Sequence, residues 1–285
     1  MGNLAWLNGN IYELDDAKIG VQDRGFLFGD GVYDVIKIYN SKPFRLSAHL
    51  DRLQRSSLAI RIAIPHAKEE IENITKSLIE RSKCSDGFIY MQVTRGCAPR
   101  DHLFPAGVTP TLLIYILDIG SPPARKDVKP GKCITLPDER WMNCHIKSTN
   151  LLPNVLAIQK AKEAGAGEAI LFRPDGLITE GTRTNIFAVI DNEVRTHPES
   201  NLILAGITRS IAIDIFRKSD TPCFEKAFNL EDLKKATEVW TTSTGLEISP
   251  VHSIDETRIG EVVPGPVCRY LIEEFWNIVG TECYT

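Results

Sequence analysis

Three segments with strong strand character most constrain the fold of this chain. Residues 31–40, GVYDVIKIYN, alternate between two faces, which is the pattern of a β-strand with one buried side. One face of that strand carries Val32, Asp34, Ile36 and Ile38. Residues 87–96 and 109–119 are rich in the β-branched and aromatic side chains that strands favour. The sequence therefore predicts a sheet in this part of the chain.

Two helices and a hairpin complete the first unit. Asn8-Gly9 separates two short strand segments near the N-terminus, which favours a tight hairpin. We expect a helix over 47–62 that is capped by Ser47, and a second amphipathic helix over 66–83. The apolar stripe of the first helix is formed by Leu50, Leu53, Leu58 and Ile60.

A stretch rich in proline, glycine and charge, IGSPPARKDVKPG, follows the third strand and indicates a linker. Beyond it, residues 168–197 are expected to form three strands, and residues 238–251 one strand with a polar middle. Helices are expected over residues 150–167, 207–220, 229–236 and 267–279. We predict an α+β fold with a smaller domain over residues 1–118, a linker over 119–125 and a larger domain over 126–285.

The composition argues against several classes of protein. The chain has 285 residues, of which 43% are hydrophobic and 25% charged, as in a globular protein. Its formal charge of -4, without any basic run, argues against nucleic acid as the main partner. No apolar segment approaches the roughly 20 residues of a membrane span, and no signal-peptide pattern begins the chain. Seven scattered cysteines are typical of reduced thiols, so we expect a cytoplasmic location.

Lys147 stands in the stretch HIKSTNLLPNVLA, away from the charged blocks of the chain. A lysine at a strand-to-helix junction is most often a solvated surface charge. Here its flanking residues are small and polar and the following helix is apolar, which indicates partial burial. A desolvated lysine has a lowered pKa and becomes a nucleophile toward carbonyl groups. Both interpretations stay open on these residues alone.

Glu180 begins a dense polar stretch, EGTRTN, between two apolar strand segments. It is either an ordinary turn carboxylate or a fixed anion opposite a cation such as a protonated ring nitrogen. Thr182, Arg183, Thr184 and Asn185 add many hydrogen-bond donors. So many consecutive polar groups are unusual for a simple turn.

Two further stretches could bind an anion. Gly206 precedes a helix start with Thr208 in the first turn, and the free amides of such a helix end suit a phosphate. Residues 241–250, TTSTGLEISP, form a second hydroxyl-rich group. Each pattern alone is also compatible with an ordinary helix start or strand end.

Arginines and a histidine follow the second predicted strand in the loop VTRGCAPRDHLFP. Arg100 and His102, two residues apart, suit a substrate carboxylate, although an exposed basic loop is the simpler interpretation. Arg52 is ambiguous between a phosphate ligand and an ion-pair partner. The histidines have no metal-ligand spacing, and the chain has neither a GxSxG nor a GxGxxG motif, so we predict no metal site, serine hydrolase or nicotinamide site.

Taken in order, these motifs are similar to those of fold-type IV pyridoxal-phosphate (PLP) enzymes. The series is DRGFLFGDGVYDVIKIYN, HLDRL, IKSTNLLPNVLA, ITEGTRTNIF, GITR and TSTGLEISPV, and it covers nearly the whole chain. Within that family, GVYDVIKIYN and the loop with Arg100 and His102 most resemble D-amino acid aminotransferases.

The resemblance implies a role for each candidate residue. Lys147, in the larger domain, would hold PLP as a Schiff base and serve as general base and acid. Glu180 would keep the pyridine nitrogen protonated, and Leu204 would pack against the ring. The phosphate would be bound by Arg52, Ile207, Thr208, Ser243 and Thr244, and the substrate carboxylate by Tyr33, Arg100 and His102.

The resemblance also implies a homodimer and a reaction. The loop of Arg100 and His102 would come from the neighbouring subunit. The reaction would move the amino group between D-amino acids, of the D-alanine or D-glutamate type, and 2-oxo acids such as 2-oxoglutarate. The alternative is a branched-chain L-amino acid or R-selective amine transaminase of the same fold. Arg183 departs from the serine expected at its position, with an effect on either side-chain preference or cofactor contact.

Overall fold

A computed structural model describes residues 3–120 and 128–285, which form two compact units. The first unit comprises the described residues of Met1–Pro123 with Ile146–Asn150 and Val279–Thr285, and the second those of Ala124–His145 with Leu151–Ile278. The segment of Lys147 thus belongs to the first unit, whereas the sequence-based boundaries assigned it to the larger domain. Of the predicted linker over 119–125, residues 121–125 lie outside the described residues.

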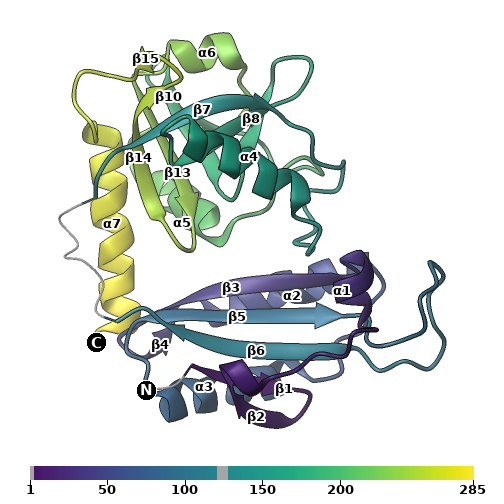
Figure 1. The fold of residues 1–285 in the computed structure, drawn as a ribbon. Helices are drawn as coiled ribbons and strands as arrows, with labels where there is room; N and C mark the ends of the chain where they lie inside the picture. Colours follow the sequence, from purple (N-terminus) through teal and green to yellow (C-terminus); the bar gives the residue numbers. More distant parts are fainter. Residues whose placement is uncertain (1–2, 121–127) are drawn as a thin grey trace. The chain divides into compact units, whose positions relative to one another are not determined.

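The first unit is an antiparallel sheet with helices on one face (Figure 1). Its strands follow the order β2-β1-β6-β5-β3-β4. The elements are β1 (Leu4–Leu7), β2 (Asn10–Glu13), a 3-10 turn (Leu14–Asp16), α1 (Arg24–Phe28), β3 (Gly31–Tyr39), β4 (Lys42–Pro43), α2 (Leu46–Ala59), α3 (Lys68–Ser82), β5 (Gly87–Thr94) and β6 (Thr111–Asp118). The strands predicted from 31–40, 87–96 and 109–119 are confirmed, and they pair as neighbours.

Strand β3 shows why the alternating pattern specifies this sheet. Val32, Ile36 and Ile38 are buried in one apolar core with residues of α2 and α3. The opposite face carries Tyr33, which stacks on Tyr90 of β5 with ring centroids 5.7 Å apart. The core face therefore binds the helices, and the aromatic face is available for other contacts.

Two expectations about the first helix are wrong. Helix α2 begins at Leu46 after Arg45, so Ser47 lies inside the helix and caps nothing. Leu58 is 60% exposed, whereas Leu50 and Leu53 are buried as predicted. The buried face also carries Leu46 and four polar residues, His49, Arg52, Ser56 and Ser57. A search for apolar periodicity misses these polar residues, because ion pairs and hydrogen bonds make their burial possible.

The second unit is built on a mixed sheet of order β12-β11-β10-β13-β14-β7-β8-β9, with β15 paired to β14. Its elements are β7 (Gly131–Pro137), α4 (Leu152–Glu163), β8 (Glu168–Phe172), β9 (Ile178–Gly181), β10 (Asn185–Ile190), β11 (Glu193–Thr196), α5 (Ile207–Arg217), β12 (Cys223–Glu225), α6 (Leu230–Lys234), β13 (Glu238–Ser243), β14 (Glu247–Ile254), β15 (Thr257–Arg258) and α7 (Pro266–Cys283), whose last residues fall in the first unit. The predicted α+β fold is confirmed. In the described part of the chain, no helix is long and apolar enough to cross a membrane.

The strand predictions for the second unit need two corrections. Residues 168–197 form four strands rather than three, because a tight turn, closed by a hydrogen bond from Gly181 N to Thr184 O at 2.7 Å, separates β9 from β10. Residues 238–251 form the hairpin β13–β14 rather than one strand. In both places the polar residues noticed in the sequence mark a reversal of the chain.

Candidate active site

Lys147 is fixed at the edge of the first unit's sheet by its main chain. Tyr33 N donates to Lys147 O at 3.0 Å, and Lys147 N donates to Ser56 Oγ of α2 at 3.1 Å. The adjacent Ser148 forms an isolated bridge with Val32. The segment thus extends the pairing of β3. Its small polar residues allow the main chain to approach that strand closely.

The Lys147 side chain lies over the aromatic face of the sheet. It is half-buried, and its Nζ is 4.5 Å from the centroid of the Tyr33 ring. Tyr33 stacks on Tyr90, which in turn stacks on Tyr115 at 4.8 Å. The sequence-predicted pair Lys147 and Tyr33 is therefore brought together within one unit.

Arg52 is buried on α2 and bound by Asp34 of β3. Its Nε donates to Asp34 Oδ2 and its Nη2 to Asp34 Oδ1, both at 2.8 Å, a bidentate pair. His49 Nδ1 lies 2.7 Å from Asp34 Oδ1. Burial raises the pKa of Asp34, but Arg52 and His49 lower it further, so the net pKa lies well below its ordinary value. The ionised carboxylate holds the guanidinium in one orientation.

Arg100 and His102 lie on the exposed loop between β5 and β6. The Arg100 guanidinium carbon is 5.1 Å from the centroid of the Phe28 ring, and the His102 ring is 5.3 Å from the same centroid. One aromatic ring thus supports both side chains that the sequence assigned to carboxylate binding.

Glu180, at the end of β9, belongs to a buried charged cluster in the second unit. Arg140 Nη1 contacts Glu180 Oε1, and Asp138 binds the same guanidinium through bonds of 2.9 Å from Nε and Nη2. Asn185 Nδ2 donates to Glu180 Oε2 at 3.0 Å. Burial raises the pKa of Glu180, and the shared Arg140 offsets this only in part. A further cation beside Glu180 would therefore stabilise the ionised form of its carboxylate.

Leu204 links Glu180 to the start of helix α5. Its N–H donates to Glu180 Oε2 at 2.9 Å, and its carbonyl accepts from Asn185 Nδ2 at 2.9 Å. Gly206 is the N-cap of α5 and provides no side-chain cap for Ile207 or Thr208. A Cβ on Gly206 would lie 2.1 Å from Asn185 Oδ1, so only glycine fits this close approach. The free amides of α5 thus come shortly after Leu204 in the sequence, and Leu204 binds Glu180.

Ser243 and Thr244 come to the same end of the second sheet. Thr242 of β13 pairs with Asn185 of β10 in the strand register, which places the turn after β13 beside the start of β10. Ser243 Oγ accepts from Leu246 N at 3.0 Å and shapes this turn. The predicted residues Glu180, Leu204, Ile207, Thr208, Ser243 and Thr244 therefore gather within one unit.

The polar stretch after Glu180 divides into two groups. Thr182 and Thr184 point inward, and their hydroxyls donate to Glu168 at 2.5 and 3.0 Å. Arg183 between them is exposed. The threonines thus fix the turn, and Asn185 is the residue of this stretch that binds Glu180.

The family model described as amino-transferase class IV matches residues 31–254. The chain is a class IV aminotransferase. The D-alanine aminotransferase of Bacillus licheniformis is 42% identical to it over 276 residues, which cover 96% of each chain. That of Staphylococcus haemolyticus is 39% identical over 272 residues, 95% of each chain.

Solved structures place the aminotransferase in the same fold family. The branched-chain amino acid aminotransferase of Escherichia coli matches with a TM-score of 0.90 and 26% identity, covering 98% of this chain and 95% of the other. The T.th. branched-chain amino acid aminotransferase with pyridoxamine 5'-phosphate matches with a TM-score of 0.89 and 27% identity, covering 98% and 94%. The predicted family, fold class, PLP cofactor and aminotransferase activity are confirmed.

The residues of the second unit fit PLP. Glu180 shares Arg140 with Asp138, which also pairs with Arg173. A protonated pyridine nitrogen would therefore add positive charge beside the buried Glu180 carboxylate. The uncapped start of α5 suits a phosphate. Thr242 Oγ1 is buried beside this start and has no hydrogen-bond partner among the described residues. Glu180 thus suits the positive charge of a protonated ring nitrogen, and the start of α5 suits the negative charge of the phosphate.

Several residues of the aminotransferase that support the site were missed from the sequence. Asp34 was placed on the buried face of its strand without a role, and His49 and Arg140 were not connected with any function. A charged residue on the core face of a predicted strand was the available signal for Asp34. For Arg140 the sequence offers no comparable signal, because its partners Asp138 and Glu180 are brought together only by the sheet.

We predict that Asp34→Asn lowers the free energy of unfolding by about 3–5 kcal/mol at neutral pH, because it leaves the buried Arg52 without its counter-charge. The folded-state pKa of Asp34 lies below its unfolded value of roughly 4. The stabilisation is therefore present above that pH and is lost as the pH falls through the folded-state pKa. Urea unfolding across this pH range measures both effects.

Asp51→Asn is the matched control on the same helix. Asp51 pairs with Lys68, but its side chain is 49% exposed, so the loss should stay below about 1 kcal/mol. Equal losses for the two variants, or a difference that does not shrink at low pH, would contradict the assignment.

Proposed function

We propose that the aminotransferase moves the amino group between D-alanine or D-glutamate and a 2-oxo acid such as 2-oxoglutarate. The observation that carries this proposal is the match, along nearly the whole chain, to proteins named D-alanine aminotransferase at 37% to 42% identity. It confirms the predicted D-amino acid transaminase. The loop with Arg100 and His102 supports the same substrate class through its paired donors for a carboxylate.

Lys147 and Glu180 are the residues that we assign to the chemical step. PLP, when bound, supplies an electron sink for the bond that breaks at the substrate Cα. Lys147 Nζ would hold the cofactor until the substrate amine displaces it, and the freed amine would then carry the Cα proton as general base and acid. Glu180 provides the negative charge that keeps the ring nitrogen protonated, and its burial strengthens that interaction.

The remaining cofactor contacts follow from the donors described above. Arg52 and the amides of Ile207 and Thr208 bind the phosphate, together with Ser243 and Thr244. Leu204 packs against the ring. The bidentate Asp34–Arg52 pair and the uncapped α5 start support these assignments, because both fix their donors before a ligand arrives.

Handedness follows from where the substrate carboxylate is held. We assign it to Tyr33, Arg100 and His102, which presents the Cα hydrogen of a D-amino acid to Lys147. A carboxylate held at the turn of residues 244–246 would instead select L-amino acids. Arg183 is exposed at the turn after β9 and is free to influence side-chain preference.

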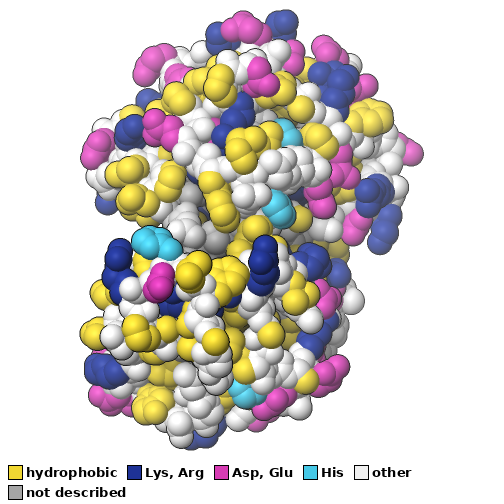
Figure 2. Space-filling model, turned by 90° about the vertical axis from the view of Figure 1, so that its right-hand side faces the viewer, with side chains coloured by type: hydrophobic (Ala, Val, Ile, Leu, Met, Phe, Trp, Pro, Cys, Tyr) yellow, Lys and Arg dark blue, Asp and Glu magenta, His cyan; other side chains and the backbone are white. Residues whose placement is uncertain are grey.

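We further propose a homodimer in which Arg100 and His102 serve the site of the neighbouring subunit. Phe26, Leu103, Leu152 and Leu156 are each more than half exposed. Hydrophobic side chains also gather in several places on the face drawn in Figure 2. Burial of such side chains against another chain would remove apolar surface from water. The cytoplasmic location stays a prediction.

The substrate proposal predicts a strong preference for one enantiomer. With PLP and 2-oxoglutarate, D-alanine should be turned over at least about 100-fold faster than L-alanine, because only the D-isomer directs its Cα hydrogen to Lys147. Turnover of L-leucine at equal or greater rates would favour the branched-chain activity of the structural neighbours instead. Alanine and leucine enantiomers measured side by side separate the two.

The shared-site proposal predicts complementation between inactive subunits. Lys147→Ala and Arg100→Ala should each be nearly inactive at low D-alanine concentration. A random mixture of the two chains should recover about a quarter of wild-type activity, since half the molecules are mixed dimers with one intact site of two. No recovery, in a mixture shown to contain mixed dimers, would place Lys147 and Arg100 of the same chain in one site.

A further inference from the structure

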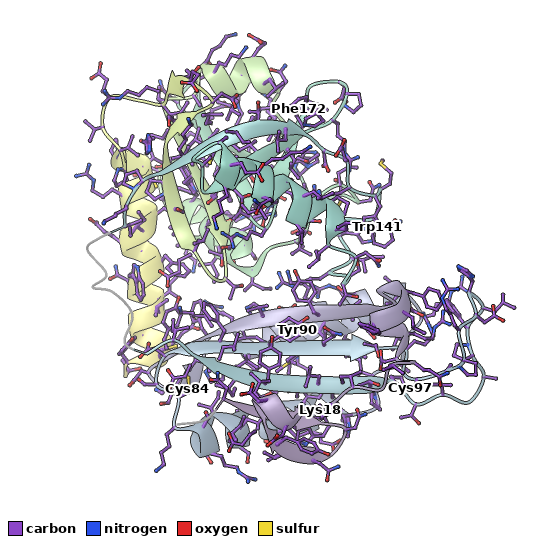
Figure 3. All side chains as sticks on the ribbon, in the orientation of Figure 1. Lys18, Cys84, Tyr90, Cys97, Trp141 and Phe172 are labelled. Carbon is purple, nitrogen blue, oxygen red and sulfur yellow. The ribbon has the colours of Figure 1, made fainter. Side chains whose placement is uncertain are left out.

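The loop between β5 and β6 extends past the end of the first unit's sheet and carries Arg100 and His102 (Figure 1). Its root is tied to the chain before α1 by an isolated bridge between Asp23 and Cys97. Figure 3 labels Cys97 at this root. The tip, beyond the bridge, is exposed. It keeps one orientation only if other groups hold its main chain.

Arg24 is the first residue of α1, and its buried side chain contacts this tip. It is 3% exposed. Its Nη1 donates to Asp101 O at 2.5 Å, and its Nη2 donates to His102 O at 3.4 Å. Its Nε donates to Asp30 Oδ2 at 2.8 Å. A single guanidinium thus joins an anchored carboxylate to the two carbonyls that follow Arg100.

Asp30 is anchored in turn by Arg95, at the end of β5. Arg95 Nε donates to Asp30 Oδ2 at 2.8 Å and Nη2 to Oδ1 at 2.9 Å. Its guanidinium carbon also lies 3.7 Å from the centroid of the Phe104 ring, which belongs to the same loop. Burial raises the pKa of Asp30, but Arg95 and Arg24 lower it further, so it stays ionised. Arg24 and Arg95 therefore contact the tip at Asp101, His102 and Phe104.

Phe28 completes the support through the side chains. The guanidinium carbon of Arg24 is 4.8 Å from the centroid of its ring, beside the contacts already described for Arg100 and His102. The backbone of the tip is therefore set by Arg24, and its two functional side chains rest on a ring of the same helix.

We propose that Arg24 is a positioning residue for substrate binding. By holding the carbonyls of Asp101 and His102, it sets the direction in which Arg100 and His102 meet the substrate carboxylate. This inference rests on the proposed role of that loop. The contacts lie within one chain, so they act in the same way when the loop serves the neighbouring subunit.

The arrangement requires an arginine. The planar guanidinium points one N–H at Asp30 and others at the two carbonyls, whereas a lysine ammonium is a compact charge on a flexible stem. Arg24→Lys therefore keeps the charge near Asp30 but loses the simultaneous hold on the loop. Arg24→Met keeps most of the packing against Phe28 and removes every donor.

The test measures kcat and KM for D-alanine together with PLP affinity in Arg24→Lys and Arg24→Met. Arg81→Lys, an exposed arginine in the last turn of α3, is the control. We expect KM to rise on the order of tenfold in both Arg24 variants while kcat changes less than about threefold. PLP affinity and the control should stay at wild-type values. Combining Arg24→Lys with Arg100→Ala should raise KM by less than the product of the two single effects, because part of the Arg24 effect acts through Arg100.

Each contrary result has a distinct meaning. Wild-type KM in Arg100→Ala would overturn the carboxylate role of the loop and this inference with it. A raised KM in Arg100→Ala beside wild-type values in both Arg24 variants would overturn the positioning role alone. A loss of PLP affinity in step with the rise in KM, or additive effects in the double variant, would show that Arg24 acts on general stability instead.

Discussion

The backbone pairing of Lys147 with Tyr33 is the contact on which the rest of this aminotransferase's site depends. The chain returns to the first unit for the segment Ile146–Asn150, and its main chain is bonded on both sides of the lysine, to β3 and to α2. Without this pairing, Lys147 would be a flexible side chain at a strand-to-helix junction. With it, the ammonium lies beside Tyr33 and near the elements that carry Asp34 and Arg52.

Two buried aspartates, Asp34 and Asp138, and the partly buried Asp30 fix the orientation of several arginines. Asp34 holds Arg52, Asp30 holds Arg24 and Arg95, and Asp138 shares Arg140 with Glu180. A buried ion pair adds little net stability, but it fixes the direction of a side chain that would otherwise be mobile. Side chains fixed in this way are oriented before any ligand binds, which reduces the entropy that binding must overcome.

Local pattern predicted the parts of this fold that depend on burial of apolar groups. The alternation in residues 31–40 gave β3 and its core face, because strand period and apolar burial coincide there. The same reasoning missed the polar part of the buried face of α2. It also missed the turn at residues 182–184, where two threonine hydroxyls bind Glu168. Those features depend on partners that are distant in sequence.

The candidate site shows the same division. Lys147, Glu180 and the start of α5 were assigned to the candidate site from the order of motifs along the chain, whereas Arg140 and Arg24 were not. Arg140 binds Glu180, and Arg24 binds the carbonyl of Asp101, and in both cases the partner is far away in the sequence. The residues assigned to ligand contacts lie in recognisable sequence motifs. The residues that hold them in place show much weaker sequence patterns.

The identity of the cofactor-binding lysine tests the central claim most directly. PLP-loaded protein is reduced with borohydride, digested, and mapped by peptide mass spectrometry. We expect a pyridoxyl group on Lys147 and none on the Lys147→Ala variant. A label on another lysine, such as Lys37 of β3, or no label on the wild-type chain would contradict the assignment of Lys147.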